Sequence, residues 1–322
     1  MTKKPVKKPS KKAALKPVAA PVQTGSVVER AMLVTLRQSI WRANRTDDEV
    51  TAEVAKKHGN RADMGTYKKF LVDPSALQGG YDILRKAKAI HCRYTLPWMD
   101  GGQRILSGAA YFDYTREMNK LLQEYNEWVD NTFIPKYPDH KKAAKEALNG
   151  LYKEEDYPTS VTIRSKFGME IIPDLISNPS DFRVKLGNDT VDHLKKELSV
   201  SVEKRLQDAI KDVWSRLQEV VSHMVQRLNK YEVEEVSQNG KCKAKVKVKH
   251  TFRDTLVTNI TELLEVVPLL NITNDPNLAE FCTTIREQLT GVAPEVLRDD
   301  EKQRKQVAQK AEDILKKIGA FL

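Results

Sequence analysis

The sequence predicts a mainly α-helical protein with a small β component, arranged as a long-helix bundle or an antiparallel coiled-coil-like stalk with a β-hairpin and short strands. Three observations support this fold class. Apolar residues recur at helical spacing from residue 191 to 231, an Asn-Gly pair at 239–240 separates two alternating segments, and charged residues make up 30% of the chain. So many charges suit helices that bury one stripe and expose the rest of their surface to water.

Residues 1–25 form a lysine-rich tail that we expect to be extended and disordered. The tail has no acidic residue, its prolines interrupt helices, and its like charges repel each other. It holds seven of the ten net positive charges, so the rest of the chain carries only +3. Two interpretations stay open: sequence-independent binding of DNA or RNA through phosphate contacts, or an arm that aids solubility and touches any acidic partner. The seven charges belong to Lys3, Lys4, Lys7, Lys8, Lys11, Lys12 and Lys16.

The first ordered region, residues 26–157, is predicted to be a helical domain. Apolar residues at helical spacing indicate a first helix that runs from the start of this region to Arg45. Thr46 fits as the N-cap of a second helix, which should end at Gly59 because glycine readily adopts the left-handed conformation of a helix end. Asp73, followed by proline, fits as the N-cap of a third helix.

An aromatic-rich heptad seam follows at residues 111–128, where apolar side chains alternate at spacings of three and four. We expect a partner helix to pack along this seam. Nucleic-acid bases could stack on such a surface, but a regular aromatic stripe is more typical of a protein core. The predicted interface consists of Tyr111, Tyr114, Met118, Leu121, Tyr125 and Trp128.

Residues 158–188 are predicted to be a small β-containing connector, because proline, asparagine and glycine interrupt the helical pattern there. We expect short strands near Phe167–Ile172 and Phe182–Leu186. The last region, residues 189–322, should begin with a nearly straight helix, because the mean step of its apolar stripe is about 3.6 residues. This helix would be roughly 60 Å long, so it must pack against other helices or pair with a second copy.

A β-hairpin should follow the long helix and turn at Asn239-Gly240. In the expected register Glu234 faces Lys245, which pairs opposite charges across the two strands. Two features then divide the C-terminal part into helices. Pro268 should end one helix, and Pro294 should open a last helix of about 25 residues.

The sequence contains no recognisable catalytic or cofactor motif. Glycine-rich nucleotide loops, HExxH and GxSxG are absent, and the three cysteines lie too far apart for a zinc site. We therefore expect no enzyme activity, no cofactor and no metal. No run of about 18 apolar residues occurs, and no apolar segment follows the basic N-terminus as it would in a secretory signal, so a cytoplasmic location without a membrane partner is expected.

Three weaker patterns could carry chemistry, and each has a simpler structural interpretation. Adjacent His91-Cys92 have the residue types of a nucleophile and base, but neighbours on a helix point about 100° apart. The acidic run Glu154–Asp156 could hold a divalent cation, yet such runs before a proline are usually solvated loops. The glycines of Asp100–Arg104 allow close approach of a ligand to the backbone, or form a turn between two helices.

Several phrases of the sequence resemble an uncharacterised family of phage and bacterial proteins. These phrases are TLPWMDGGQRIL, EEDYPTSVTIRSKFG, SDFRVKL and TFRDTLVTNI, and the resemblance spans roughly residues 27–320. It implies a phage or mobile-element origin, host-cytoplasmic if phage-encoded, and a gene neighbourhood that includes a MoxR-like AAA ATPase as a protein partner. It brings no catalytic residues.

We therefore predict a non-enzymatic accessory protein that assembles through its long helices, as a homo-oligomer or with a protein partner, and acts as an adaptor or scaffold. The alternative is a nucleic-acid-binding protein that contacts DNA or RNA through the lysine tail. An unrecognised enzyme is the third hypothesis, and it requires a cleft that gathers groups such as His91, Asp100, Glu154 or Asp156.

Overall fold

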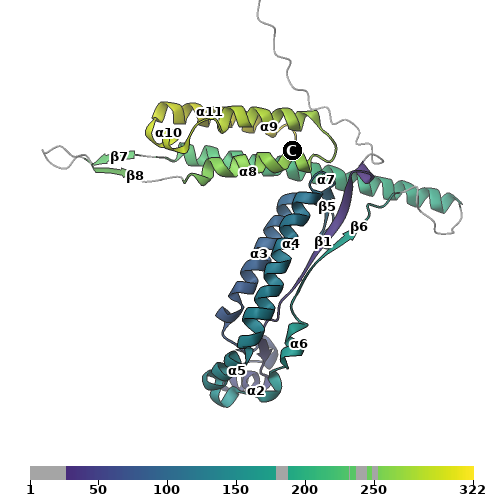
Figure 1. The fold of residues 1–322 in the computed structure, drawn as a ribbon, viewed down its shortest axis with the longest axis vertical. Coiled ribbons are helices and arrows are strands. Elements are labelled where there is room, and N and C mark those ends of the chain that lie inside the picture. Colours follow the sequence, from purple (N-terminus) through teal and green to yellow (C-terminus); the bar gives the residue numbers. More distant parts are fainter. Residues whose placement is uncertain (1–26, 179–187, 232, 237–244, 249–252) are drawn as a thin grey trace, which may run out of the picture. The chain divides into compact units, whose positions relative to one another are not determined.

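The computed structural model describes residues 27–178, 188–231, 233–236, 245–248 and 253–322, and its fold is mainly α-helical with a small antiparallel β component, as predicted (Figure 1). The chain divides into two compact units. One comprises Arg30–Ile176, and the other comprises the described residues from Ser177 to Leu322 together with residues 27–29. We call them the N-terminal unit and the C-terminal unit. The lysine tail, residues 1–25, lies outside the described residues.

A four-stranded antiparallel sheet lies at the centre of the N-terminal unit. Its strand order is β4-β5-β1-β6, with β1 at Ala31–Ser39, β4 at Thr95–Pro97, β5 at Gln103–Ser107 and β6 at Gly168–Asp174. The strand expected near residue 167 is thus confirmed by β6. The helix expected up to Arg45 is wrong, because β1 occupies this stretch and pairs on both sides with β5 and β6. Sheet pairing between distant segments overrode the local apolar spacing.

Two antiparallel helices, α3 (Gln78–Tyr94) and α4 (Tyr111–Trp128), pack side by side next to this sheet (Figure 1). Asp73 caps the short 3₁₀ helix Pro74–Leu77 that leads into α3, which confirms the predicted start. A one-turn π-helix, Val129–Phe133, joins α4 to α5 (Ile134–Leu148). The pair approaches closely at one end, where the Trp128 ring lies over Gly79 and Gly80.

The remaining elements of this unit form a smaller assembly around α2 (Asp48–His58). Gly59 ends α2 with φ of 66°, as predicted, but the N-cap is Asp47 and not Thr46. Asp47 accepts a hydrogen bond from the Val50 N–H, and its carboxylate also reaches a buried lysine. The other short elements are β2 (Asn44–Thr46), β3 (Lys68–Phe70), α6 (Ser160–Arg164) and 3₁₀ turns at Ala62–Met64, Asn149–Leu151 and Glu154–Asp156.

The C-terminal unit contains the predicted long helix, α7, which spans Asn188–Asn229 and has 42 residues. Four shorter helices accompany it: α8 (Thr255–Leu270), α9 (Pro276–Leu289), α10 (Pro294–Asp299) and α11 (Glu301–Ile318). Two helix-end predictions are wrong. Pro268 lies within the last turn of α8, and the expected single last helix is broken at Asp300, which caps α11.

The β-hairpin of the C-terminal unit is formed by β7 (Val233–Val236) and β8 (Lys245–Val248). Its register pairs Glu234 with Lys247, two residues away from the predicted partner Lys245. A two-residue offset preserves the alternation of the strands, so a glutamate position still faces a lysine position. The Asn239-Gly240 turn and the strand expected at 182–186 lie outside the described residues. None of the described helices is long and apolar enough to cross a lipid bilayer.

Candidate functional site

A buried lysine joins three segments of the N-terminal unit. The side chain of Lys69, on β3, is 2% exposed, and its ammonium lies 3.2 Å from a carboxylate oxygen of Asp47 and 2.8 Å from one of Asp156. The same ammonium donates to the backbone carbonyl of Leu151 at 2.9 Å. Because Asp47 caps the start of α2 and Asp156 ends the 3₁₀ turn at 154–156, this group, the Lys69 centre, holds both elements against β3.

Asp156 also neutralises a second cation on the neighbouring strand. Arg45 and Lys69 are directly opposite each other in the β2–β3 ladder, where like charges repel. One Asp156 oxygen lies 3.0 Å from the Arg45 guanidinium while the other contacts Lys69. The carboxylate thereby converts a repulsive cross-strand pair into a bridged one.

The electrostatics of the Lys69 centre favour the charged forms of Lys69 and Asp47. Burial alone lowers the pKa of Lys69, but the hydrogen bonds and charges of Asp156 and Asp47 outweigh it, so the pKa is raised overall. The Val50 N–H and then Lys69 hold the pKa of Asp47 below its ordinary value. An amine that stays protonated cannot act as a nucleophile or form a Schiff base. The cluster joins α2, β3 and the turn at 154–156 through ion pairs and a hydrogen bond.

The opposite face of the same ladder is open to solvent. Alternate residues of a strand point to opposite sides, so Asn44, Thr46, Lys68 and Phe70 share the face away from Arg45 and Lys69. Both cross-strand pairs on this face, Asn44 with Phe70 and Thr46 with Lys68, consist of exposed residues. We call these four residues the outer ladder face.

A second exposed feature lies at the start of α7. Val191, Leu194 and Leu198 continue the apolar stripe that is buried from Val202 onward, yet none of residues 189–201 is buried. Further along α7, Trp214 is buried and stacks on Phe321, which follows α11, with ring centroids 4.4 Å apart. The first turns of α7 thus present an amphipathic face without a buried position.

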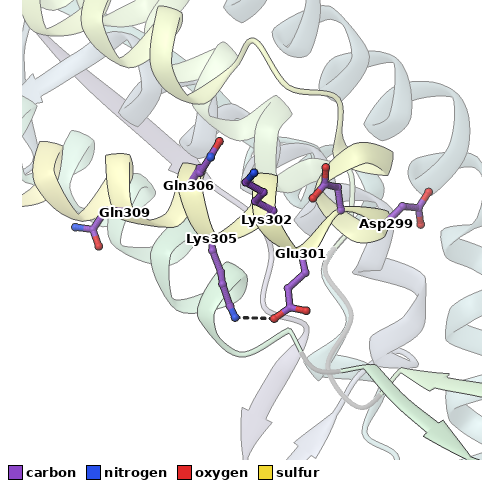
Figure 2. A pocket seen from close by; sticks show the side chains of 7 residues that line it. Asp299, Glu301, Lys302, Lys305, Gln306 and Gln309 are labelled. Carbon is purple, nitrogen blue, oxygen red and sulfur yellow. Dashed lines mark ion pairs between the residues drawn. The ribbon is translucent and has the colours of Figure 1, made fainter.

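Figure 2 shows a surface hollow at the junction of α10 and α11 that is lined by polar side chains. Glu301 and Lys305 form an ion pair of 2.6 Å across one turn. Asp300 accepts from the Gln303 N–H and caps α11. Because Glu301 is paired with Lys305 and Asp300 caps α11, acidic and basic side chains are mixed along the hollow and it carries no concentrated charge of one sign. Its remaining lining residues are Asp299, Lys302, Gln306 and Gln309.

The structure places the predicted aromatic seam inside the N-terminal unit. Tyr114, Met118, Leu121 and Tyr125 are buried where α3 packs along α4, which supplies the partner helix expected from the heptad spacing. Of the six seam residues only Tyr111 is exposed, and Trp128 covers the glycines of α3. The face that the sequence suggested for a partner therefore belongs to the core of this unit.

The side chains of the three weaker patterns, at 91–92, 100–104 and 154–156, take part in contacts or turns within the N-terminal unit. His91 is buried and shares a 2.8 Å hydrogen bond with the Tyr114 hydroxyl. Glu154 pairs with Lys141 and accepts from the Tyr152 hydroxyl, so the acidic run is divided between two ion clusters. Among the described residues no group of His, Cys, Asp or Glu could hold a metal ion. The loop at 100–102 is the turn of the β4–β5 hairpin rather than a turn between helices.

Comparison with known proteins adds no relatives. No family model, no curated protein and no solved structure matches this chain significantly. The Lys69 centre was missed from the sequence because nothing in the Lys68-Lys69 pair distinguishes the buried lysine from the exposed one. The alternation of strand β3 would have revealed it only if the strand itself had been recognised.

Proposed function

We propose that this chain is a non-enzymatic adaptor or scaffold protein that assembles by pairing the first turns of α7 with those of a second copy. The half-buried stripe of Val191, Leu194 and Leu198 carries this proposal, because no residue of this stretch of α7 is fully buried. Burial of apolar surface drives most protein association, and these residues continue, without a break, the face that is buried further along the helix.

The spacing of the stripe suits pairing between identical helices. Steps of three and four residues are those of a coiled-coil seam, in which side chains of one helix insert between those of the other. A symmetric pair brings the same surface of both copies together. Residues 189–201 would span roughly 20 Å at 1.5 Å per residue, which allows two to three layers of contact.

The sequence resemblance extends the proposal to biological context. We propose a phage or mobile-element origin for the chain and a role in presenting a partner, such as the AAA ATPase of that gene neighbourhood, on the paired helices. Two compact units in one chain suit such a role, because each can carry a different contact surface.

Light scattering coupled to size-exclusion chromatography tests the pairing on the full-length chain. Wild type should run above the 36.7 kDa of one chain at high micromolar concentration, and a Leu194→Lys, Leu198→Lys double variant should be monomeric. Val200→Lys is the matched control, because Val200 is 57% exposed and points to the opposite side of the helix. Monomeric wild type, or equal dissociation by the control, would refute pairing through this stripe. Circular dichroism checks that each variant keeps its helices.

A further inference from the structure

The outer ladder face combines one exposed aromatic ring with one lysine and two uncharged hydrogen-bonding groups. Phe70 is 55% exposed, although its neighbour on the same strand, Lys69, is almost completely buried on the other face. Lys68 lies two positions before Phe70, on the same face, and Thr46 and Asn44 face them across the ladder. The four positions include no carboxylate.

The charges of this small sheet are divided between its two faces. On the inner face, Asp47 and Asp156 neutralise Lys69 and Arg45. On the outer face Lys68 has no carboxylate within ion-pair distance among the described residues. Lys68 therefore offers a positive charge without a carboxylate partner on the side where Phe70 is exposed, whereas Arg45 on the inner face, although 59% exposed, is paired with Asp156.

Further exposed apolar side chains lie on the chain just before β3. Met64 is 75% exposed and Tyr67 is 37% exposed. The Tyr67 N–H donates to the Thr51 hydroxyl at 3.0 Å, which fixes this segment against the first turn of α2. The segment that leads into β3 is thus held against α2 by this hydrogen bond.

We propose that the outer ladder face binds single-stranded nucleic acid, with a base stacked on Phe70 and a neighbouring phosphate held by Lys68. Proteins that bind single strands without sequence preference combine these two elements, an exposed ring for a base and cations for the backbone. A duplex keeps its bases stacked inside and offers no free base to an isolated ring. An acidic protein segment would pair with Lys68, but its carboxylates would not stack on the Phe70 ring.

This surface is separate from the lysine tail. The tail can contribute only phosphate contacts, because it contains no aromatic residue, whereas the outer ladder face distinguishes single strands from duplexes through the ring. The surface would bind nucleic acid whether or not α7 pairs with a second copy, so a monomeric protein that binds DNA refutes the pairing proposal alone.

Fluorescence anisotropy with labelled oligothymidylate, longer than the roughly 16 nucleotides of a single binding site, tests the proposal. The full-length chain is used in a background in which the seven tail lysines are replaced by glutamine. Phe70→Leu should weaken binding roughly 5- to 150-fold, the range expected for loss of one stacked base. Lys68→Gln should reduce the slope of log affinity against log salt by about 0.7.

Phe112→Leu and Lys120→Gln are the matched controls, because both residues are exposed on α4 of the same unit. Neither control should change affinity or salt slope, and unlabelled duplex should compete poorly. The proposal is overturned if binding disappears with the tail lysines alone, if Phe112→Leu weakens binding as much as Phe70→Leu, or if duplex competes as well as single strands. Binding of an acidic protein that depends on Phe70, without binding of the oligonucleotide, also overturns it.

Discussion

The Asp156 carboxylate accepts from the Lys69 ammonium at 2.8 Å, and both side chains are at most 5% exposed. Charges removed from water in this way depend on their partners, because an uncompensated buried charge costs several kcal/mol. Asp156→Asn would leave Arg45 and Lys69 opposite each other with no bridging charge, while Asp47 still compensates Lys69. We therefore expect local destabilisation of about 3 kcal/mol, at the lower end of the effect of breaking a buried pair.

Native-state hydrogen exchange is the suitable measurement, because a two-unit chain has no single free energy of unfolding. The amide hydrogens of Val50 and Leu71, bonded to Asp47 and to Ala43, report on the elements around the Lys69 centre. Glu170→Gln is the control, since it removes the exposed pair with Arg37 and should change stability by less than about 1 kcal/mol. Unchanged exchange in Asp156→Asn would show that the centre contributes little to stability.

The long helices could be predicted from the sequence, whereas strand β1 and the Lys69 centre could not. Helices with a strong single stripe, such as α4 and α7, were predicted because each buries one continuous face. Strand β1 was missed because its nine residues, paired on both sides, show no simple alternation, with Leu33 and Val34 buried next to each other. Contacts between distant segments, such as Lys69 with Asp156, leave no mark in local periodicity, so neither the ion centre nor the outer ladder face could be derived.

Replacement of His91 should flatten the dependence of stability on pH between about 4 and 6.5. Burial, with a smaller contribution from the Arg104 guanidinium, lowers the pKa of His91 to about 4, whereas an unfolded chain has a histidine pKa of about 6.5. Between these values the unfolded state binds more protons than the folded state. Stability from this residue is therefore fully present above pH 6.5 and decreases as the pH falls toward 4.

His91→Gln keeps a hydrogen-bonding group next to the Tyr114 hydroxyl but removes the titration. Hydrogen exchange of α3 and α4 at pH 6.5 and pH 4.5 should show a smaller loss of protection in this variant than in wild type. His193→Gln, at an exposed position of α7, is the control and should behave like wild type. An undiminished pH dependence in His91→Gln would assign the acid sensitivity of this unit to other groups.

Gly80→Ala should destabilise the α3–α4 pair even though alanine favours helices. A methyl group at Gly80 would lie 2.5 Å from the nearest atom of the Trp128 ring. The same methyl group would lie 3.1 Å from the end of the Ile40 side chain. The clash outweighs the gain of up to about 1 kcal/mol in helix propensity, because overpacking of a core commonly costs about 1 to 3 kcal/mol. Hydrogen exchange of the α3 and α4 amides measures the loss. Gly65→Ala, where nothing lies within 4 Å, should leave this exchange unchanged, and equal protection of α3 and α4 in Gly80→Ala and wild type would contradict the expected clash.

Arg304→Lys should loosen the junction between α10 and α11. The buried Arg304 guanidinium donates to the carbonyls of Leu297 and Arg298 at 3.0 and 3.1 Å and lies 4.5 Å from the centre of the Tyr231 ring. A lysine ammonium is a compact charge that cannot both reach two carbonyls and cover the ring as a planar guanidinium does. We expect a loss of about 1 to 3 kcal/mol, the cost of leaving buried hydrogen-bonding groups unsatisfied.

Hydrogen exchange at the amide hydrogens of Leu297 and Asp300, which close α10, measures this loss directly. Their exchange should accelerate in Arg304→Lys while that of α3 and α4 in the other unit stays unchanged, because the two units have separate cores. Arg227→Lys, at an exposed position on α7, controls for the change of side chain and should leave both rates as in wild type. Acceleration in both units would mean that Arg304 stabilises the whole chain rather than this helix junction.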